Sequence, residues 1–145
     1  MKIIPFTAEH GKFIATRRLN NDLLKVKPEY TDMLDQLEKP GMSWTGLIEN
    51  KIIAAGGMVN MWGNVYEGWV MATIDIHDYP IQTARIIKKI FDRVMIDNKV
   101  ERLQTTVRSD FEIGHKFAQW LGLKSEGVMK QYMDKEDYNL YARVF

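Results

Sequence analysis

Residues Val107–Leu123 have the sequence VRSDFEIGHKFAQWLGL, and the sequence SEGVMKQY follows almost directly at Ser125–Tyr132. This stretch predicts the end of a strand, a short helix, a glycine that stops the helix, and a new strand. Gly122 stands where helices commonly end in a left-handed residue, a conformation that glycine adopts without steric cost. Alternating residues from Val128 onward indicate the next strand.

The short helix and the strand before it can be read in more detail. Before the helix, Leu103, Thr105 and Val107 alternate with Gln104 and Thr106. This period of two residues is typical of a half-buried strand. Either Ser109 or Asp110 can cap the first turn with a side-chain oxygen. Three large apolar residues predict the buried face of the helix: Phe117, Trp120 and Leu121. A helix this short persists only if that face is packed.

This arrangement resembles the C-terminal half of the GNAT superfamily of acyl-CoA N-acyltransferases. In many members that half reads roughly V-x-x-x-N-x-x-A-x-x-L-Y-x-x-L-G-F. Laid on this chain without gaps, the pattern matches Val107, Leu121 and Gly122, and Phe117 and Leu123 are close substitutes. The resemblance covers the second half of the chain well and the first half by element order.

Within that superfamily, the chain is most similar to the GNAT-like proteins of tailed phages and prophages. Those proteins carry runs that resemble G-E-x-W-V and R-L-Q-x-T-V-R-x-D-F. The corresponding residues here are Glu67, Trp69 and Val70, followed by Arg102, Leu103, Gln104, Thr106, Val107, Arg108, Asp110 and Phe111.

Length and composition predict one globular domain over residues 1–145, because 46% of the residues are hydrophobic and 27% are charged. The net charge of +1 argues against partnership with nucleic acid or an anionic membrane. The chain has no cysteine, which excludes thiol chemistry and disulfides. It shows no signal peptide and no membrane-spanning run, so we expect a soluble, cytoplasmic protein.

The predicted elements give an α+β fold with a mixed, mostly antiparallel sheet flanked by helices. The expected strands are Lys2–Phe6, Trp44–Glu49, Ile52–Met61, Glu67–Thr73, Leu103–Val107, Ser125–Tyr132 and Tyr138–Val144. The expected helices start near Ala8, which Thr7 can cap, and cover Glu29–Glu38, Ile81–Lys99 and the short stretch after Val107. The first helix would bury Phe13, Ile14, Leu19, Leu23 and Leu24. Strands Glu67–Thr73 and Leu103–Val107 should pair in parallel, joined by the long helix.

The resemblance implies that acyl-CoA lies between these two parallel strands. It also implies that main-chain amides hold the thioester at Met71, Ala72 and Thr73, and the pyrophosphate at Ile76, His77, Asp78 and Tyr79. The corresponding family loop resembles Q/R-x-x-G-x-G/A, but the loop at 74–80 contains neither glycine nor arginine. It carries two carboxylates instead, and Pro80 lacks a donor amide. We therefore expect weak or absent acetyl-CoA binding, and a simpler role for Asp78 is to cap the long helix.

The resemblance also suggests catalytic residues, with two departures from the family pattern. The family's asparagine falls on Phe111, and its tyrosine, often the acid that reprotonates the CoA thiolate, falls on Ala118. The nearest phenols that could replace it are Tyr132 and Tyr138, although both can equally be ordinary sheet aromatics. Glu67 occupies the strand start where several members place a general base, and a solvated carboxylate is the other interpretation.

Two functions remain open at this point. The first is an acetyl-CoA-dependent N-acetyltransferase with a degenerate cofactor loop, which would act on an amine-bearing small molecule or protein. The second is a non-catalytic GNAT-fold protein that serves as a structural or interaction part of a phage, in contact with other phage or host proteins and packaged in the virion. No metal is expected, because the three possible ligands at Asp75, His77 and Asp78 share one loop without a partner.

Overall fold

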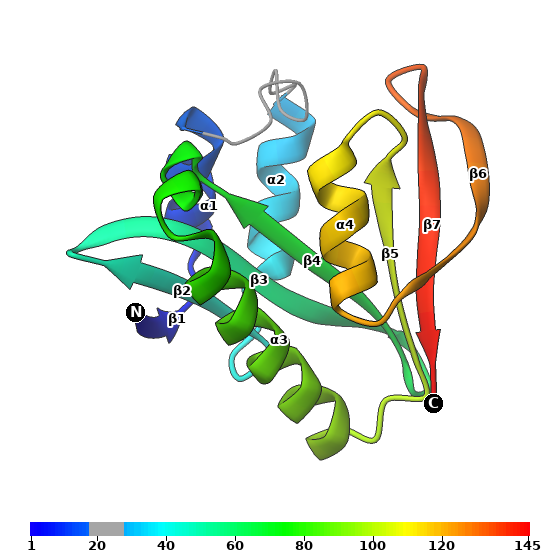
Figure 1. Ribbon diagram of the computed structural model, residues 1–145, viewed down its shortest axis with the longest axis horizontal. Coiled ribbons are helices and arrows are strands. Elements are labelled where there is room, and N and C mark those ends of the chain that lie inside the picture. The colour runs from blue at the N-terminus through cyan, green and yellow to red at the C-terminus, as the bar shows by residue number, and fades with distance from the viewer. Residues whose placement is uncertain (18–27) are drawn as a thin grey trace. The chain divides into compact units, whose positions relative to one another are not determined.

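A computed structural model describes residues 1–17 and 28–145 (Figure 1). Its elements are β1 (Lys2–Pro5), α1 (Ala8–Thr16), α2 (Pro28–Leu37), β2 (Ser43–Ile48), β3 (Lys51–Trp62), β4 (Val65–Ala72), the 3₁₀ helix η1 (Ile74–Asp78), α3 (Pro80–Asp97), β5 (Arg102–Arg108), α4 (Glu112–Trp120), β6 (Lys124–Met133) and β7 (Glu136–Val144). The predicted Leu19, Leu23 and Leu24 lie outside the described residues. Within the described ranges, no helix is long and apolar enough to cross a membrane.

The sheet has seven strands in the order β1-β2-β3-β4-β5-β7-β6. Strand β4 pairs with β5 in parallel. The pairs β1–β2, β2–β3, β5–β7 and β6–β7 are antiparallel. This confirms the α+β class, the mostly antiparallel sheet and the predicted parallel pair. The long helix that joins the two parallel strands begins and ends one or two residues earlier than expected.

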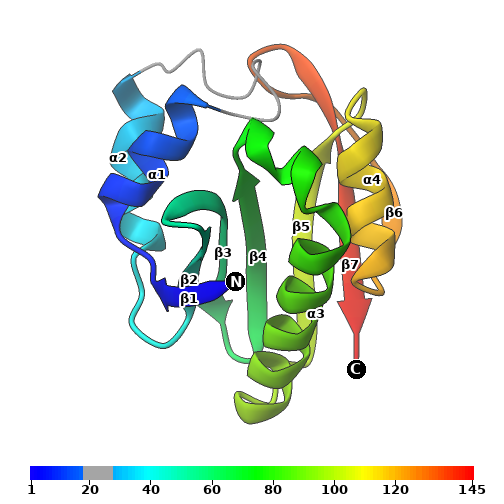
Figure 2. The same cartoon turned by 60° about the vertical axis from the view of Figure 1, so that its left-hand side comes forward.

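The chain divides into two compact units, and the first contains Met1–Val59 and Trp69–Phe91. Its N-terminal helix begins as predicted, since the Thr7 hydroxyl accepts a hydrogen bond from the His10 amide at 3.3 Å. Helices α1 and α2 lie side by side in Figures 1 and 2. Gly11 permits this close approach, because a Cβ built there would lie 2.9 Å from a methyl carbon of Leu34.

The second unit contains Asn60–Gly68 and Asp92–Phe145. Here β7 lies between β5 and β6, antiparallel to both, and α4 lies along β5. The helix comes close to the strand at Gly114, where a Cβ would lie 2.8 Å from Cγ1 of Val107. Gly122 ends the helix region with φ of +87°, which confirms its predicted role.

Two details of the predicted helix α4 are wrong. Neither Ser109 nor Asp110 caps it: the N-cap is Phe111 without a side-chain hydrogen bond, because Ser109 donates to Asn139 and Asp110 accepts from Arg108. Trp120 does not belong to the buried face, since 49% of it is exposed. The buried residues are Ala118 and Leu121, which share a face because they are three positions apart.

This packing predicts that Leu121 stabilises the fold more than the larger Trp120 beside it. Leu121 is only 6% exposed, so Leu121→Ala should lower the free energy of unfolding by about 2–5 kcal/mol, the range for emptying a buried leucine site. Trp120→Ala is the matched control and should lower it less. Urea denaturation followed by circular dichroism measures both, and equal losses would show that α4 is not seated through Leu121.

Candidate functional site

Glu67 is the candidate catalytic residue with the clearest structural setting. It is half-buried on β4 and lies opposite Gln104 of β5, where the parallel pairing of the two strands ends. Burial raises the pKa of the Glu67 carboxyl above its usual value, because the charged form loses part of its hydration. A carboxylate in this setting takes up a proton more readily than one in water, so it is suited to act as a base at higher pH.

Tyr132, the other candidate catalytic residue, lies on β6 and is exposed. Its ring is 5.5 Å from that of buried Tyr138, which is paired with Arg108 of β5. Glu67 is paired with Gln104, which lies four residues before Arg108 on β5. At 3.3 Å per residue, Gln104 and Arg108 are about 13 Å apart along the strand. Tyr132 is also on β6, beyond β5 and β7 in the sheet order. The structure therefore does not bring Tyr132 and Glu67 together.

The positions of two family residues are filled by apolar side chains that have structural roles. Phe111 is the N-cap residue of α4, and Ala118 is buried beneath the same helix. His115 lies on α4, one turn before Ala118. Its Nδ1 is hydrogen-bonded to the hydroxyl of Tyr141 at 2.8 Å, and its Nε2 to the carbonyl of Ser109 at 2.9 Å. Because both ring nitrogens have hydrogen-bond partners, we assign His115 a structural role in holding α4 against β7.

The segment predicted to hold the cofactor is a 3₁₀ helix, not an open loop. The amide of Thr73 donates to the carbonyl of Ile53, and the amide of Ile76 donates to the carbonyl of Thr73, at 3.0 and 3.1 Å. The amide of Tyr79 donates to the carbonyl of Ile76 at 3.0 Å. Three of the amides assigned to ligand binding are thus occupied by the protein's own backbone.

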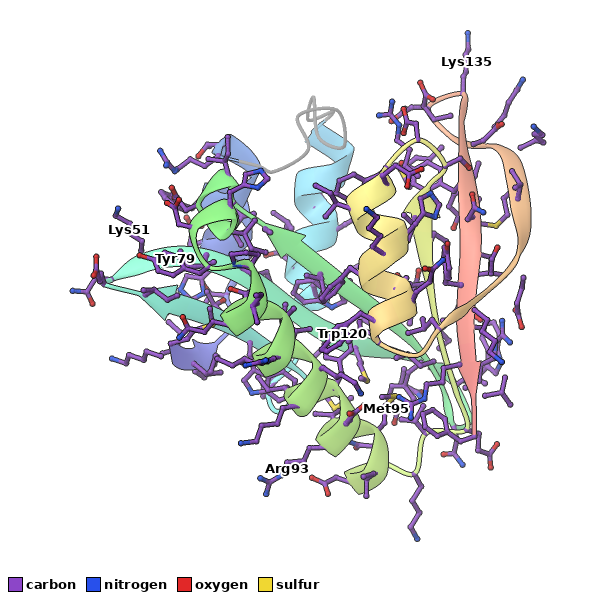
Figure 3. The ribbon with its side chains drawn as sticks, viewed as in Figure 1. Lys51, Tyr79, Arg93, Met95, Trp120 and Lys135 are labelled. Carbon is purple, nitrogen blue, oxygen red and sulfur yellow. The ribbon has the colours of Figure 1, made fainter. Side chains whose placement is uncertain are left out.

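The remaining residues of that predicted set have varied surroundings. Met71 packs against the core cluster of the first unit, and Ala72 is half-buried beside it on β4. His77 and Asp78 are exposed. The prediction that Asp78 caps the long helix is wrong, because α3 begins at Pro80 and the residue before it is Tyr79 (Figure 3).

Arg17 is a residue that the sequence did not single out. Its carbonyl accepts a hydrogen bond from the Ile74 amide at 2.7 Å, and its Nη2 lies 3.2 and 3.0 Å from the two carboxylate oxygens of Asp75. Arg17 thereby holds η1 against the end of α1 through both its backbone and its side chain. The two partners are 58 positions apart, so no local pattern pointed to the pair.

The cofactor implied by the resemblance can be tested against this geometry. A diphosphate binds at a helix start when free amides point at it and glycine allows the backbone to approach. In the segment 74–80, the amides of Ile74, Ile76 and Tyr79 are occupied and every position carries a side chain. The nearby guanidinium of Arg17 is paired with Asp75. The residues present therefore do not fit the diphosphate of acyl-CoA.

The first unit also contains an apolar pocket between α3 and the strands β1, β2 and β3. Its lining includes Ile3, Trp44, Thr83, Ile87 and Phe91. The Thr83 hydroxyl is buried and has no hydrogen-bond partner among the described residues. The lining contains no acid or base, so we do not place proton transfer there. In the ranges 1–17 and 28–145, no group of three or more acidic, histidine or cysteine side chains could hold a metal ion.

Comparison with solved structures finds similarity to several acetyltransferases. A GNAT-family acetyltransferase from Bacillus anthracis superposes with a TM-score of 0.73 at 13% identity, covering 98% of this chain and 93% of that one. A ribosomal-protein-S5-alanine acetyltransferase from Vibrio fischeri gives 0.69 at 16% identity, with 98% and 91% covered. A mutant spermidine N-acetyltransferase from Vibrio cholerae gives 0.72 at 9% identity, with 99% and 95% covered.

These likenesses establish that the chain has the GNAT fold over nearly its whole length. At such low identity, they speak for the fold and not for the activity. No protein-family model and no curated protein sequence matches the chain.

The burial of Glu67 predicts a specific pH dependence of stability. Because the folded-state pKa is raised, the native protein binds more protons than the unfolded chain between the usual and the raised pKa, so stability falls as pH rises through this window. Glu67→Gln removes that loss. Below the usual glutamate pKa, burial should make no difference between the unfolding free energies of Glu67→Gln and wild type. Above that pKa, the variant should become more stable relative to wild type as pH rises. Each unit of pKa elevation corresponds to about 1.4 kcal/mol, reduced by solvent screening at this half-buried site.

Urea denaturation of both proteins between about pH 4 and pH 8 measures this difference, since the usual glutamate pKa is about 4.3. Glu49→Gln is the matched control, because Glu49 is exposed in the turn between β2 and β3. A stability difference between Glu67→Gln and wild type that does not change with pH would contradict the assigned environment of Glu67.

Proposed function

We propose that this chain is an N-acetyltransferase that transfers an acetyl group from a thioester to an amine, with Glu67 as the general base. The observation that carries the proposal is the raised pKa of the half-buried Glu67 at the end of the β4–β5 pairing. The acetyltransferases that share the fold support the reaction class. Positioned general bases contribute about 10²–10⁴-fold to the rates of such reactions.

In the proposed reaction, Glu67 takes a proton from the acceptor ammonium. The nitrogen lone pair then attacks the carbonyl carbon of the thioester, a C–N bond forms, and the C–S bond breaks. The nitrogen then gives its second proton to solvent, and the departing thiolate takes a proton from solvent. The products are the neutral amide and the free thiol, and the first proton stays on Glu67. We do not assign the proton of the thiol to Tyr132, because its ring neighbour Tyr138 is paired with Arg108, about 13 Å along β5 from the partner of Glu67.

The segment from Ile74 to Pro80 is, in this proposal, a degenerate form of the family's cofactor loop. Its occupied amides and its carboxylates support weak binding of acetyl-CoA, about millimolar, which corresponds to a free energy of about −4 kcal/mol. The acceptor is an amine-bearing small molecule or protein. Proteins of the same fold named for spermidine and for a ribosomal-protein alanine supply the first amines to test. The reaction would take place in the cytoplasm.

A second candidate function is a non-catalytic GNAT-fold protein, used as a structural or interaction part of a phage. The observation that favours it is the combination of closed amides at η1 with buried Ala118 at the position of the family's tyrosine. Such a protein would use the surface of the fold to contact other proteins and would not catalyse a reaction of a thioester.

Thiol release from an acetyl thioester in the presence of spermidine or an alanine-terminated peptide tests the proposal. Wild type should release thiol in an amine-dependent manner, and Glu67→Gln should lower kcat/KM by about 10²–10⁴-fold because the proton acceptor is lost. Glu49→Gln should retain wild-type activity, since its exposed carboxylate lies in the β2–β3 turn. Release that Glu67→Gln leaves unchanged would refute the role of Glu67, and the absence of release with every amine would favour the non-catalytic function.

A further inference from the structure

The segment between β4 and α3 is closed to a phosphate ligand by its own hydrogen bonds. Ile74 donates to Arg17, Ile76 donates to Thr73, Tyr79 donates to Ile76, and Pro80 has no N–H, so four of the seven positions offer a ligand no free donor. A diphosphate could reach these donors only if the 3₁₀ turns opened. Backbone groups that are already paired offer an anion no uncompensated donor.

The charges at this segment lead to the same conclusion. Among the residues that the structure describes, Arg17 contacts the segment with a positive charge, and both carboxylate oxygens of Asp75 engage its guanidinium. Asp78 is exposed three positions later and adds a negative charge. A diphosphate would compete with Asp75 for Arg17 and would be repelled by Asp78.

Side chains also prevent a phosphate from approaching the backbone of the segment closely. No glycine occurs between Ile74 and Pro80, so a Cβ projects from every residue of the segment. A phosphate is therefore held away from the main chain even where an amide is free.

We propose that the segment 74–80 does not hold the diphosphate of acyl-CoA, so the nucleotide part of the donor contributes nothing to its recognition. This inference rests on the proposed acetyl transfer. The donor class is an acetyl thioester that need not carry a nucleotide, such as a free or carrier-bound acetyl-pantetheine.

The test compares acetyl-CoA with acetyl-pantetheine as donors for the full chain, with spermidine as acceptor and thiol release as readout. The two values of kcat/KM should agree within about tenfold, since a tenfold ratio corresponds to about 1.4 kcal/mol of nucleotide recognition. A preference for acetyl-CoA of more than about tenfold would overturn the inference while leaving the proposed function intact.

If neither donor is turned over with spermidine or with an alanine-terminated peptide, the proposed function fails and calorimetric titration decides the inference separately. Coenzyme A and pantetheine should then bind equally weakly. Micromolar binding of coenzyme A that pantetheine does not share would overturn the inference.

A pair of variants tests the role assigned to the Arg17–Asp75 pair. Asp75→Asn removes the competing carboxylate and frees the Arg17 guanidinium for a phosphate, so a preference for acetyl-CoA over acetyl-pantetheine should appear and should shrink as salt rises. Asp110→Asn breaks a comparable pair with Arg108 on the second unit and should leave the donor ratio unchanged. A donor ratio in Asp75→Asn equal to that of wild type would contradict the role of this pair.

Discussion

The short parallel pairing between β4 and β5 is the constraint on which the candidate site depends. It joins Val65–Glu67 to Arg102–Gln104 and ends at Glu67. Because of this register, a carboxylate that would be solvated at the start of an isolated strand is half-buried in a sheet, and its pKa rises. Burial of the carboxyl is the cause of the raised pKa of Glu67.

The sequence predicted the parts of the fold that depend on local chemistry. Gly122 was identified from its position after an apolar helix, and the parallel pair followed from two alternating segments on either side of a long helix. The caps were not predictable, because tertiary partners decide them: Ser109 is taken by Asn139, and Asp110 by Arg108. The exposure of Trp120 follows from the rotation of α4 on β5, which large apolar residues alone do not specify.

Some features of the candidate site can likewise be predicted from the local sequence, whereas others depend on long-range contacts. The lack of glycine before α3 was visible in the sequence, and it pointed to an altered cofactor segment. That the segment forms a 3₁₀ helix, and that Arg17 holds it from 58 positions away, depends on contacts that no local pattern records. The fold is shared with solved acetyltransferases, whereas the amides of Ile74, Ile76 and Tyr79 in this segment are paired with backbone carbonyls.

The pKa of the Glu67 carboxyl, measured by carbon-13 NMR titration of the folded protein, tests the central claim most directly. The usual pKa of a glutamate side chain, about 4.3, is the reference. We expect Glu67 to titrate above this value, because burial disfavours its charged form. A Glu67 midpoint at or below the usual glutamate value would show a solvated carboxylate and would contradict the assignment of Glu67 as the general base.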